Sequence, residues 1–132
     1  ESVVFDVKDE NDQQIIWNML ERADVFIHNL APGAVDRLGF SSEVLAEKFP
    51  QLIICSISGF GKGGDYEYKK AYDLIIQCEA GFVSITGSSN RPAKSGISIA
   101  DIAAGMYAFS GILTAIIQRG QLEKVQSLKF QC

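Results

Sequence analysis

The stretch LIICSIS, residues 52–58, is a short run of mostly apolar and β-branched residues without helical periodicity. Such a run, bounded by turn-forming residues, is typical of a strand that is buried on both faces, as in a parallel sheet covered by helices. A helix-like segment, Ser41–Phe49, precedes it and is ended by Pro50. The stretch therefore predicts a central strand of an α/β fold.

The segments before this strand alternate between strand and helix patterns. Ser2–Val7 and Val25–His28 are short β-rich runs, and residues 11–23 carry apolar side chains at helical spacing. An alternation of the β-α-β-α-β kind implies a parallel sheet with right-handed crossovers. We therefore expect a Rossmann-like parallel sheet with flanking helices.

Two loops follow predicted strands, at residues 29–39 and 59–64. Ligands of open parallel sheets bind beyond the carboxyl ends of the strands, so we expect these loops to lie together at one end of the sheet. Further along, the patterns predict a helix at Tyr72–Ala80, a strand at Phe82–Thr86 and a long helix from Asp101 to about residue 118.

The composition bounds the size and class of the protein. A chain of 132 residues with 47% hydrophobic content fits one compact unit with a buried core. The net charge of -4, without any run of lysine and arginine, argues against a general affinity for nucleic acid or for an anionic membrane. No uninterrupted apolar stretch approaches the length of a bilayer crossing, and no signal segment is recognisable. We therefore expect a cytoplasmic protein without a membrane partner.

The residues that commonly bind metals are sparse. Cys55, Cys78 and Cys132 are too scattered for a disulfide framework or a CxxC metal site, so no metal is expected. His28 is the only histidine, and we interpret it as a packed or surface residue rather than a metal ligand or general base. Because the chain begins at Glu1 without a methionine and runs at once into an apparent strand, we expect a fragment of a longer protein.

Asp101 is the one acidic residue in the apolar run GISIADIAAGMYAFSGIL, residues 96–113. The periodicity places it at the N-cap of the long helix, where aspartate is favoured because its carboxylate accepts hydrogen bonds from first-turn amides. The same amides would keep the carboxylate ionised, and the small neighbours leave room for a substrate, so Asp101 can also be a nucleophile. The two interpretations are compatible, and the position alone leaves both open.

The loop GFGKGG, residues 59–64, matches the GxGxxG pattern of dinucleotide-binding proteins. That fingerprint requires its third glycine to open a helix whose amides face the pyrophosphate. Here the polar residues 65–68 follow, and they start no apolar-periodic helix. A flexible glycine loop near a ligand is therefore the favoured interpretation, with nicotinamide binding as an alternative.

Five segments together resemble the family III CoA-transferases, the group that includes formyl-CoA transferase and carnitine CoA-transferase, with the related α-methylacyl-CoA racemases. The matching segments are SVVFDVK, ADVFIHNLAPGAVDRLGF, LIICSISGFGKGG, KAYDLIIQCEAG and GISIADIAAGMYAFSGILTAIIQR. They run in order up to Arg119. The resemblance implies that residues 1–119 are a fragment of the CoA-binding α/β domain and that residues 120–132 are a divergent tail of uncertain structure.

The resemblance also implies roles for individual residues. Asp101 matches the catalytic nucleophile. The implied CoA contacts are Asn29, Leu30, Gly33, Arg37 and Lys70. The implied supporting residues are Gly59, Gly61, Tyr72 and Asp73.

The implied activity is transfer of CoA from an acyl-CoA donor to a carboxylic acid acceptor through a covalent aspartyl intermediate, without a metal. The resemblance implies an interlocked homodimer for the longer family chain. Three alternatives stay open: an acyl-CoA racemase of the same superfamily, a nicotinamide-dependent oxidoreductase that uses residues 59–64, and a catalytically inert fragment. The racemases place a histidine where this chain has Tyr72.

Overall fold

The computed structural model describes residues 2–121 and 128–131 of the chain. The helices are α1 (Glu10–Leu20), α2 (Ala34–Arg37), α3 (Ser42–Lys48), α4 (Asp73–Glu79), the 3-10 helix η1 (Phe82–Ile85) and α5 (Ile99–Gln121). The strands are β1 (Val25–His28), β2 (Ile53–Ser58), β3 (Gly87–Ser88), β4 (Arg91–Pro92) and β5 (Leu128–Gln131).

The main sheet is parallel and has the strand order β1-β2-β5, with β2 in the centre. Val25 pairs with Ile53, and His28 at the end of β1 pairs with Ser56. Ile53, Ile54 and Cys55 are almost completely buried, as expected for a strand covered on both faces. The predicted α/β fold with a parallel sheet is confirmed.

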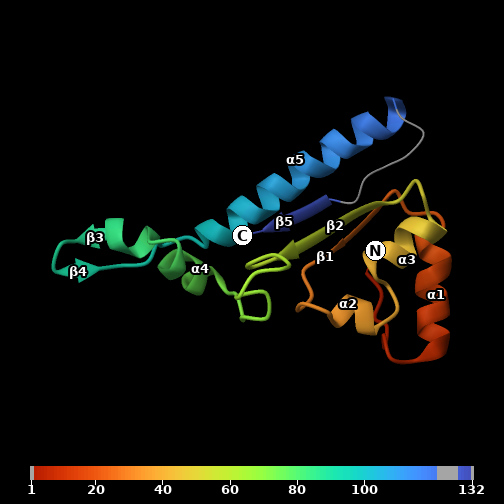
Figure 1. Cartoon of the computed structure of the whole chain (residues 1–132), viewed down its shortest axis with the longest axis horizontal. Coiled ribbons are helices and arrows are strands. Elements are labelled where there is room, and N and C mark those ends of the chain that lie inside the picture. Colours follow the sequence, from red (N-terminus) through yellow and green to blue (C-terminus); the bar gives the residue numbers. More distant parts are fainter. Residues whose placement is uncertain (1, 122–127, 132) are drawn as a thin grey trace.

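Helices cover both sides of this sheet (Figure 1). The long helix α5 runs along β2 and β5, while α1 and α3 lie on the opposite side. The buried core on the side of α1 and α3 consists of Leu20, Val35, Phe40, Leu45, Leu52 and Ile54. Trp17 packs against Phe40 beside this core, with ring centroids 4.7 Å apart. α5 presents Ala104, Ala108 and Ala115 as its buried residues, and such small side chains allow a helix to approach closely.

The predicted strand at Ser2–Val7 is wrong, because residues 2–6 have no regular structure and residues 7–8 form a turn. Val4 is 96% exposed, so this segment does not have the buried face that a strand requires. Local hydrogen bonds favour the turn instead, since the backbone N–H of Asp6 donates to Asp12 Oδ2 at 2.7 Å and the N–H of Asp9 donates to the carbonyl of Asp6. The segment therefore leads into α1, whose N-cap is Asp9.

The predicted strand at Phe82–Thr86 is also wrong, because Phe82–Ile85 form the 3-10 helix η1. Gly81 precedes it with a φ of 75°, a left-handed conformation that glycine adopts readily. The hydroxyls of Ser84 and Thr86 donate to the carbonyls of Gly81 and Phe82, at 2.6 and 2.8 Å. Such side-chain to backbone bonds compete with strand pairing and explain why the β-branched residues do not form a strand.

Strand β5 lies inside the segment 120–132, where it pairs with β2 from Cys55 opposite Leu128 to Ser58 opposite Gln131. Residues 122–127 and 132 of that segment lie outside the described part of the chain. Helix α5, at 23 residues and a mean hydropathy of 1.6, is long and apolar enough to cross a membrane by length and composition. Core helices of other proteins pass the same test, so the expected absence of a membrane partner stays a prediction.

Candidate active site

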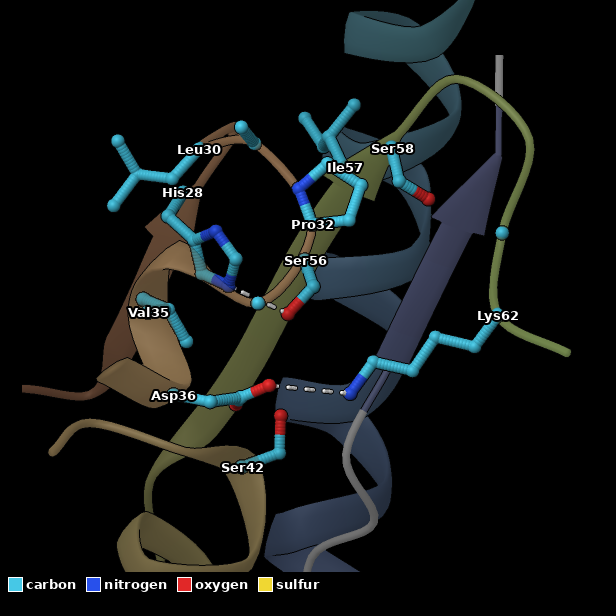
Figure 2. A pocket seen from close by; sticks show the side chains of 13 residues that line it. His28, Leu30, Pro32, Val35, Asp36, Ser42, Ser56, Ile57, Ser58 and Lys62 are labelled. Atoms are coloured by element: carbon cyan, nitrogen blue, oxygen red, sulfur yellow. Dashed lines mark hydrogen bonds and ion pairs between the residues drawn. The ribbon is translucent and has the colours of Figure 1, made fainter. Parts of the chain in front are cut away.

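The loops that follow β1 and β2 lie together at the carboxyl end of the sheet, as predicted, and enclose a cavity of about 200 Å³. Figure 2 shows the side chains around it. The lining residues are His28, Leu30, Ala31, Pro32, Gly33, Val35, Asp36, Ser42, Ser56, Ile57, Ser58, Gly61 and Lys62. The walls are mainly apolar with a few polar groups, which is the usual character of a small-molecule site.

Two glycines shape the backbone around this cavity. Gly33, at the start of α2, has a φ of 71°, and a Cβ there would approach Arg37 Nη1 to 3.0 Å. Gly61, in the loop after β2, has a φ of 72° and is buried. Side chains other than glycine are strained in this left-handed region, so both loops depend on glycine for their course.

His28 supplies the most unusual polar group of the cavity. Its Nε2 lies 2.8 Å from Ser56 Oγ, and its Nδ1 is buried without a hydrogen-bond partner among the described residues. Burial lowers the pKa of His28; Asp36 opposes this shift and Lys62 adds to it. In a neutral ring this buried nitrogen is either a donor or an acceptor, depending on the tautomer.

Asp36 and Lys62 add charged groups at the edge of the cavity, with Lys62 Nζ 3.8 Å from Asp36 Oδ2 (Figure 2).

The interpretation of His28 as a packed or surface residue missed that its ring lines the cavity. The signal that points to it is the strand register, because His28 ends β1 and pairs with Ser56 in the second half of β2.

Two of the five predicted CoA contacts line this cavity, namely Leu30 and Gly33. The other three do not line it. Asn29 and Arg37 are exposed beside it, on the loop after β1 and on α2, and Lys70 is exposed ahead of α4. The structure therefore brings together two segments, NLAPG at residues 29–33 and the glycine loop at residues 59–64. It leaves the cationic side chains of Arg37 and Lys70 at the surface.

Asp101 is not the N-cap of α5, which corrects the prediction. The helix begins at Ile99, two residues earlier, and the backbone N–H of Ile102 donates to the carbonyl of Ser98 at 2.9 Å. Asp101 therefore lies within the first helical turn. Its side chain is exposed and makes no hydrogen bond or ion pair with the described residues. The positive end of the helix dipole is close to this position and attracts a negatively charged group.

Asp73, on α4, caps α5 from a distance. Its Oδ1 accepts a hydrogen bond from the backbone N–H of Ala100 at 3.0 Å, and its Oδ2 accepts one from Gln77 Nε2 at 2.7 Å. One carboxylate oxygen thus holds the turn that carries Asp101, and the other is bonded within α4. Tyr72, which precedes Asp73, is exposed and provides no side-chain cap to α4.

Gly59 allows the end of β2 to pass close to the segment before α4. A Cβ at this position would lie 2.0 Å from the Cβ of Ala71, closer than any real contact. The residues after Gly64 form turns, and no helix begins between Gly64 and Asp73. The helix N-terminus that nicotinamide binding by this loop would need is therefore missing.

The described residues contain no cluster of histidine, cysteine and carboxylate side chains that could hold a metal ion.

Comparison with known proteins shows what this chain is similar to. The chain is 40% identical over 126 residues to the acetyl-CoA:oxalate CoA-transferase of Acetobacter aceti, which covers 94% of this chain and 32% of the relative. It is 33% identical over 119 residues to the human succinyl-CoA:glutarate CoA-transferase, which covers 89% of this chain and 27% of that relative.

Solved structures show the same fold. The crystal structure of a CAIB/BAIF family protein from Brucella suis superimposes with a TM-score of 0.92 at 36% identity, over 97% of this chain and 34% of that one. The chain thus spans about a third of the length of the relatives it matches. Because the family model matches residues 1–131, the chain belongs to CoA-transferase family III.

Proposed function

We propose that this chain carries the nucleophile and part of the CoA-binding surface of an enzyme that transfers CoA from an acyl-CoA donor to a carboxylic acid. The observation that carries the proposal is the exposed, unpaired carboxylate of Asp101 in the first turn of α5. A carboxylate in this setting is sterically open and free to attack a carbonyl carbon. The family resemblance implies the nucleophile at this same residue, Asp101.

The reaction proceeds in four exchanges. Asp101 attacks the thioester carbonyl of the donor, the C–S bond breaks, and a mixed anhydride and CoA thiolate form. The thiolate attacks the aspartyl carbonyl of this anhydride, which releases the donor acid as a carboxylate and leaves an aspartyl-CoA thioester. The acceptor carboxylate attacks that thioester, and the thiolate leaves again. The thiolate finally attacks the acceptor carbonyl of the second anhydride, which forms the new acyl-CoA and regenerates Asp101.

No step of this sequence requires a proton transfer or a metal, because every nucleophile is an anion and every leaving group is a carboxylate or a thiolate. The sequence does require that water be kept from the anhydrides. The small residues Ala100, Ala103 and Ala104 surround Asp101 in the sequence and let a flat carbonyl group approach the helix.

For CoA we propose the cavity between the loops after β1 and β2. Its apolar wall, including Leu30, suits an uncharged part of the molecule, and Asp36 and Lys62 offer polar groups at its edge. Arg37 directly follows the lining residue Asp36, Lys70 lies further along the chain, and both side chains are exposed. Their guanidinium and ammonium groups suit the phosphates of CoA. For the acceptor we propose a short dicarboxylic acid, because the named acceptors of the two relatives are oxalate and glutarate.

We also propose that the full polypeptide is a cytoplasmic homodimer. The support is the outward face of α5, a continuous stripe of large apolar side chains. Its members are Ile102, Met106, Phe109, Leu113, Ile116 and Ile117, which are 38–66% exposed. A helix that is apolar on both its sheet-facing and its outward side is normally buried inside a larger assembly. Light scattering on the full polypeptide tests this proposal, and a monomer would contradict it.

Calorimetric titration of the full polypeptide with CoA and with NAD tests the ligand class. Binding of CoA without NAD supports a CoA-transferase, whereas binding of NAD alone would support the oxidoreductase alternative. An absence of binding by either would indicate an inert protein. A transferase assay with acetyl-CoA and oxalate or glutarate then tests the reaction.

A further inference from the structure

Gln77 is a buried polar side chain in the middle of helix α4, with 1% of its surface exposed. Together with Ile76, Phe82, Ala103 and Tyr107 it lines a second, largely apolar cavity of about 230 Å³ between α4, η1 and α5. A primary amide in such surroundings is costly unless both its donor and its acceptor are used.

Both ends of this amide are used. The Oε1 atom of Gln77 accepts a hydrogen bond from the backbone N–H of Ser95 at 2.9 Å, and Nε2 donates to Asp73 Oδ2 at 2.7 Å. The other oxygen of Asp73 accepts from the N–H of Ala100 at 3.0 Å. Gln77 and Asp73 therefore connect α4 to two backbone amides, one on each side of the point where α5 begins.

We propose that Gln77 is a positioning residue for the nucleophile, and this inference rests on the proposed role of Asp101. Gln77 fixes the segment that leads into α5 through Ser95, and it holds the Asp73 carboxylate in the orientation that caps Ala100. Asp101 follows Ala100 directly, so its place relative to a bound thioester depends on this network. An error of about 1 Å in such a position lowers turnover by about 100-fold.

The donor function of the amide can be separated from its acceptor function. The Gln77→Glu substitution keeps an oxygen that accepts from Ser95 N–H, but its carboxylate has no hydrogen to donate to Asp73. Two facing carboxylates repel each other and take up a shared proton as the pH falls, which restores a donor. The titratable residues on the segments that contact this position are Asp73 on the same helix, Lys94 next to Ser95, Tyr107 on α5 and Asp101 in the first turn of α5.

In the full polypeptide we expect Gln77→Glu to lower kcat at neutral pH by about 10- to 100-fold, while KM for acyl-CoA changes less than twofold. The ratio of variant to wild-type kcat should rise again as the pH is lowered. Gln77→Met, which fills the same space without a donor or acceptor, should lose kcat to a similar extent without recovery at low pH. Gln118→Glu, the same change at an exposed position of α5, should leave kcat and its pH profile unchanged.

Each outcome decides the proposal. A Gln77→Glu variant with wild-type kcat at neutral pH, or with a loss that does not recover on acidification, would contradict it. If Gln77→Glu does not fold, Gln77→Met decides: a lower kcat with retained CoA binding supports the positioning role, and a lower melting temperature with unchanged kcat overturns it. Labelling of Asp101 by acyl-CoA in the wild type separates the two proposals, because its absence refutes the nucleophile itself rather than the role of Gln77.

Discussion

Asp73 and Ala100 are joined by a hydrogen bond of 3.0 Å from the backbone N–H of Ala100 to Asp73 Oδ1, so a side chain of α4 caps the first turn of α5. The two residues are 27 positions apart in the chain. Helix caps are usually supplied by the residue just before the helix. Here the cap comes from another helix, and it connects the stability of α5 to the geometry around Asp101.

Asp73→Ala should therefore affect both stability and turnover. Loss of the cap should lower the free energy of unfolding by about 1 kcal/mol, and kcat should fall because the turn that carries Asp101 is no longer held. Asp9→Ala is the matched control, since Asp9 caps α1 by accepting from the amides of Asn11 and Asp12. Thermal melts and kcat measured on the same samples should show destabilisation of both variants, larger for Asp73→Ala because the buried Nε2 of Gln77 also loses its acceptor, and a loss of kcat for Asp73→Ala alone. Equal kcat values in the two variants would refute the coupling.

Gly59→Ala should destabilise the protein through a direct clash. The added Cβ would lie 2.0 Å from Ala71 Cβ, and overpacking of this kind costs about 1–3 kcal/mol. Gly64→Ala is the control, because no atom lies within 4 Å of a Cβ at that position. Chemical denaturation should show a loss for Gly59→Ala that the second substitution Ala71→Gly partly restores. A Gly59→Ala variant as stable as Gly64→Ala would show that the two segments do not approach as described.

His28 should make stability depend on pH in the acidic range. Burial lowers the pKa of His28 below its usual 6.5, so between the two values the unfolded chain binds more protons than the folded chain. The free energy of unfolding should consequently decrease as the pH falls below 6.5. Denaturation midpoints measured from pH 7.5 downward should show this slope in the wild type and a smaller slope in His28→Gln. An identical slope in the variant would mean that another group titrates.

Racemisation at the α-carbon should be absent. That reaction requires an acid and a base on opposite faces of the substrate. The chain has Tyr72 where the racemases carry a histidine, and both oxygens of the neighbouring Asp73 accept hydrogen bonds. Incubation of the full polypeptide with a 2-methylacyl-CoA in deuterated water, followed by mass spectrometry, should show no incorporation at the α-carbon. Deuterium uptake that disappears in Tyr72→Phe would assign the protein to the racemases.

The parallel sheet and the meeting of its two loops could be predicted from sequence because the signals are local. LIICSIS and the Val25–His28 run are short apolar segments separated by a helical pattern, which predicts parallel strands, and the loops that follow parallel strands, residues 29–39 and 59–64, lie at the same end of the sheet. The Ser2–Val7 and Phe82–Thr86 runs carry the same kind of residues. They do not form strands, because local turn and hydroxyl hydrogen bonds take their place.

The start of α5 could not be predicted from sequence, because the residue that caps it is distant. A local pattern looks for a capping side chain immediately before the apolar period, and Asp101 satisfies that pattern. The observed helix starts at Ile99 because Asp73 satisfies the amide of Ala100. The importance of Gln77 is hidden for the same reason, since its partners lie on another segment of the chain.

The most direct test of the account is the covalent labelling of Asp101. The full polypeptide, incubated with acyl-CoA and then with hydroxylamine, should yield a peptide modified at Asp101, because anhydrides and thioesters of its side chain react with this nucleophile. Asp101→Asn should give no label and should lose about 10⁴-fold or more in kcat. Its free energy of unfolding should change by no more than about 1 kcal/mol. A label on another residue, or an Asn variant that retains substantial transferase activity, would contradict the assignment of Asp101 as the nucleophile.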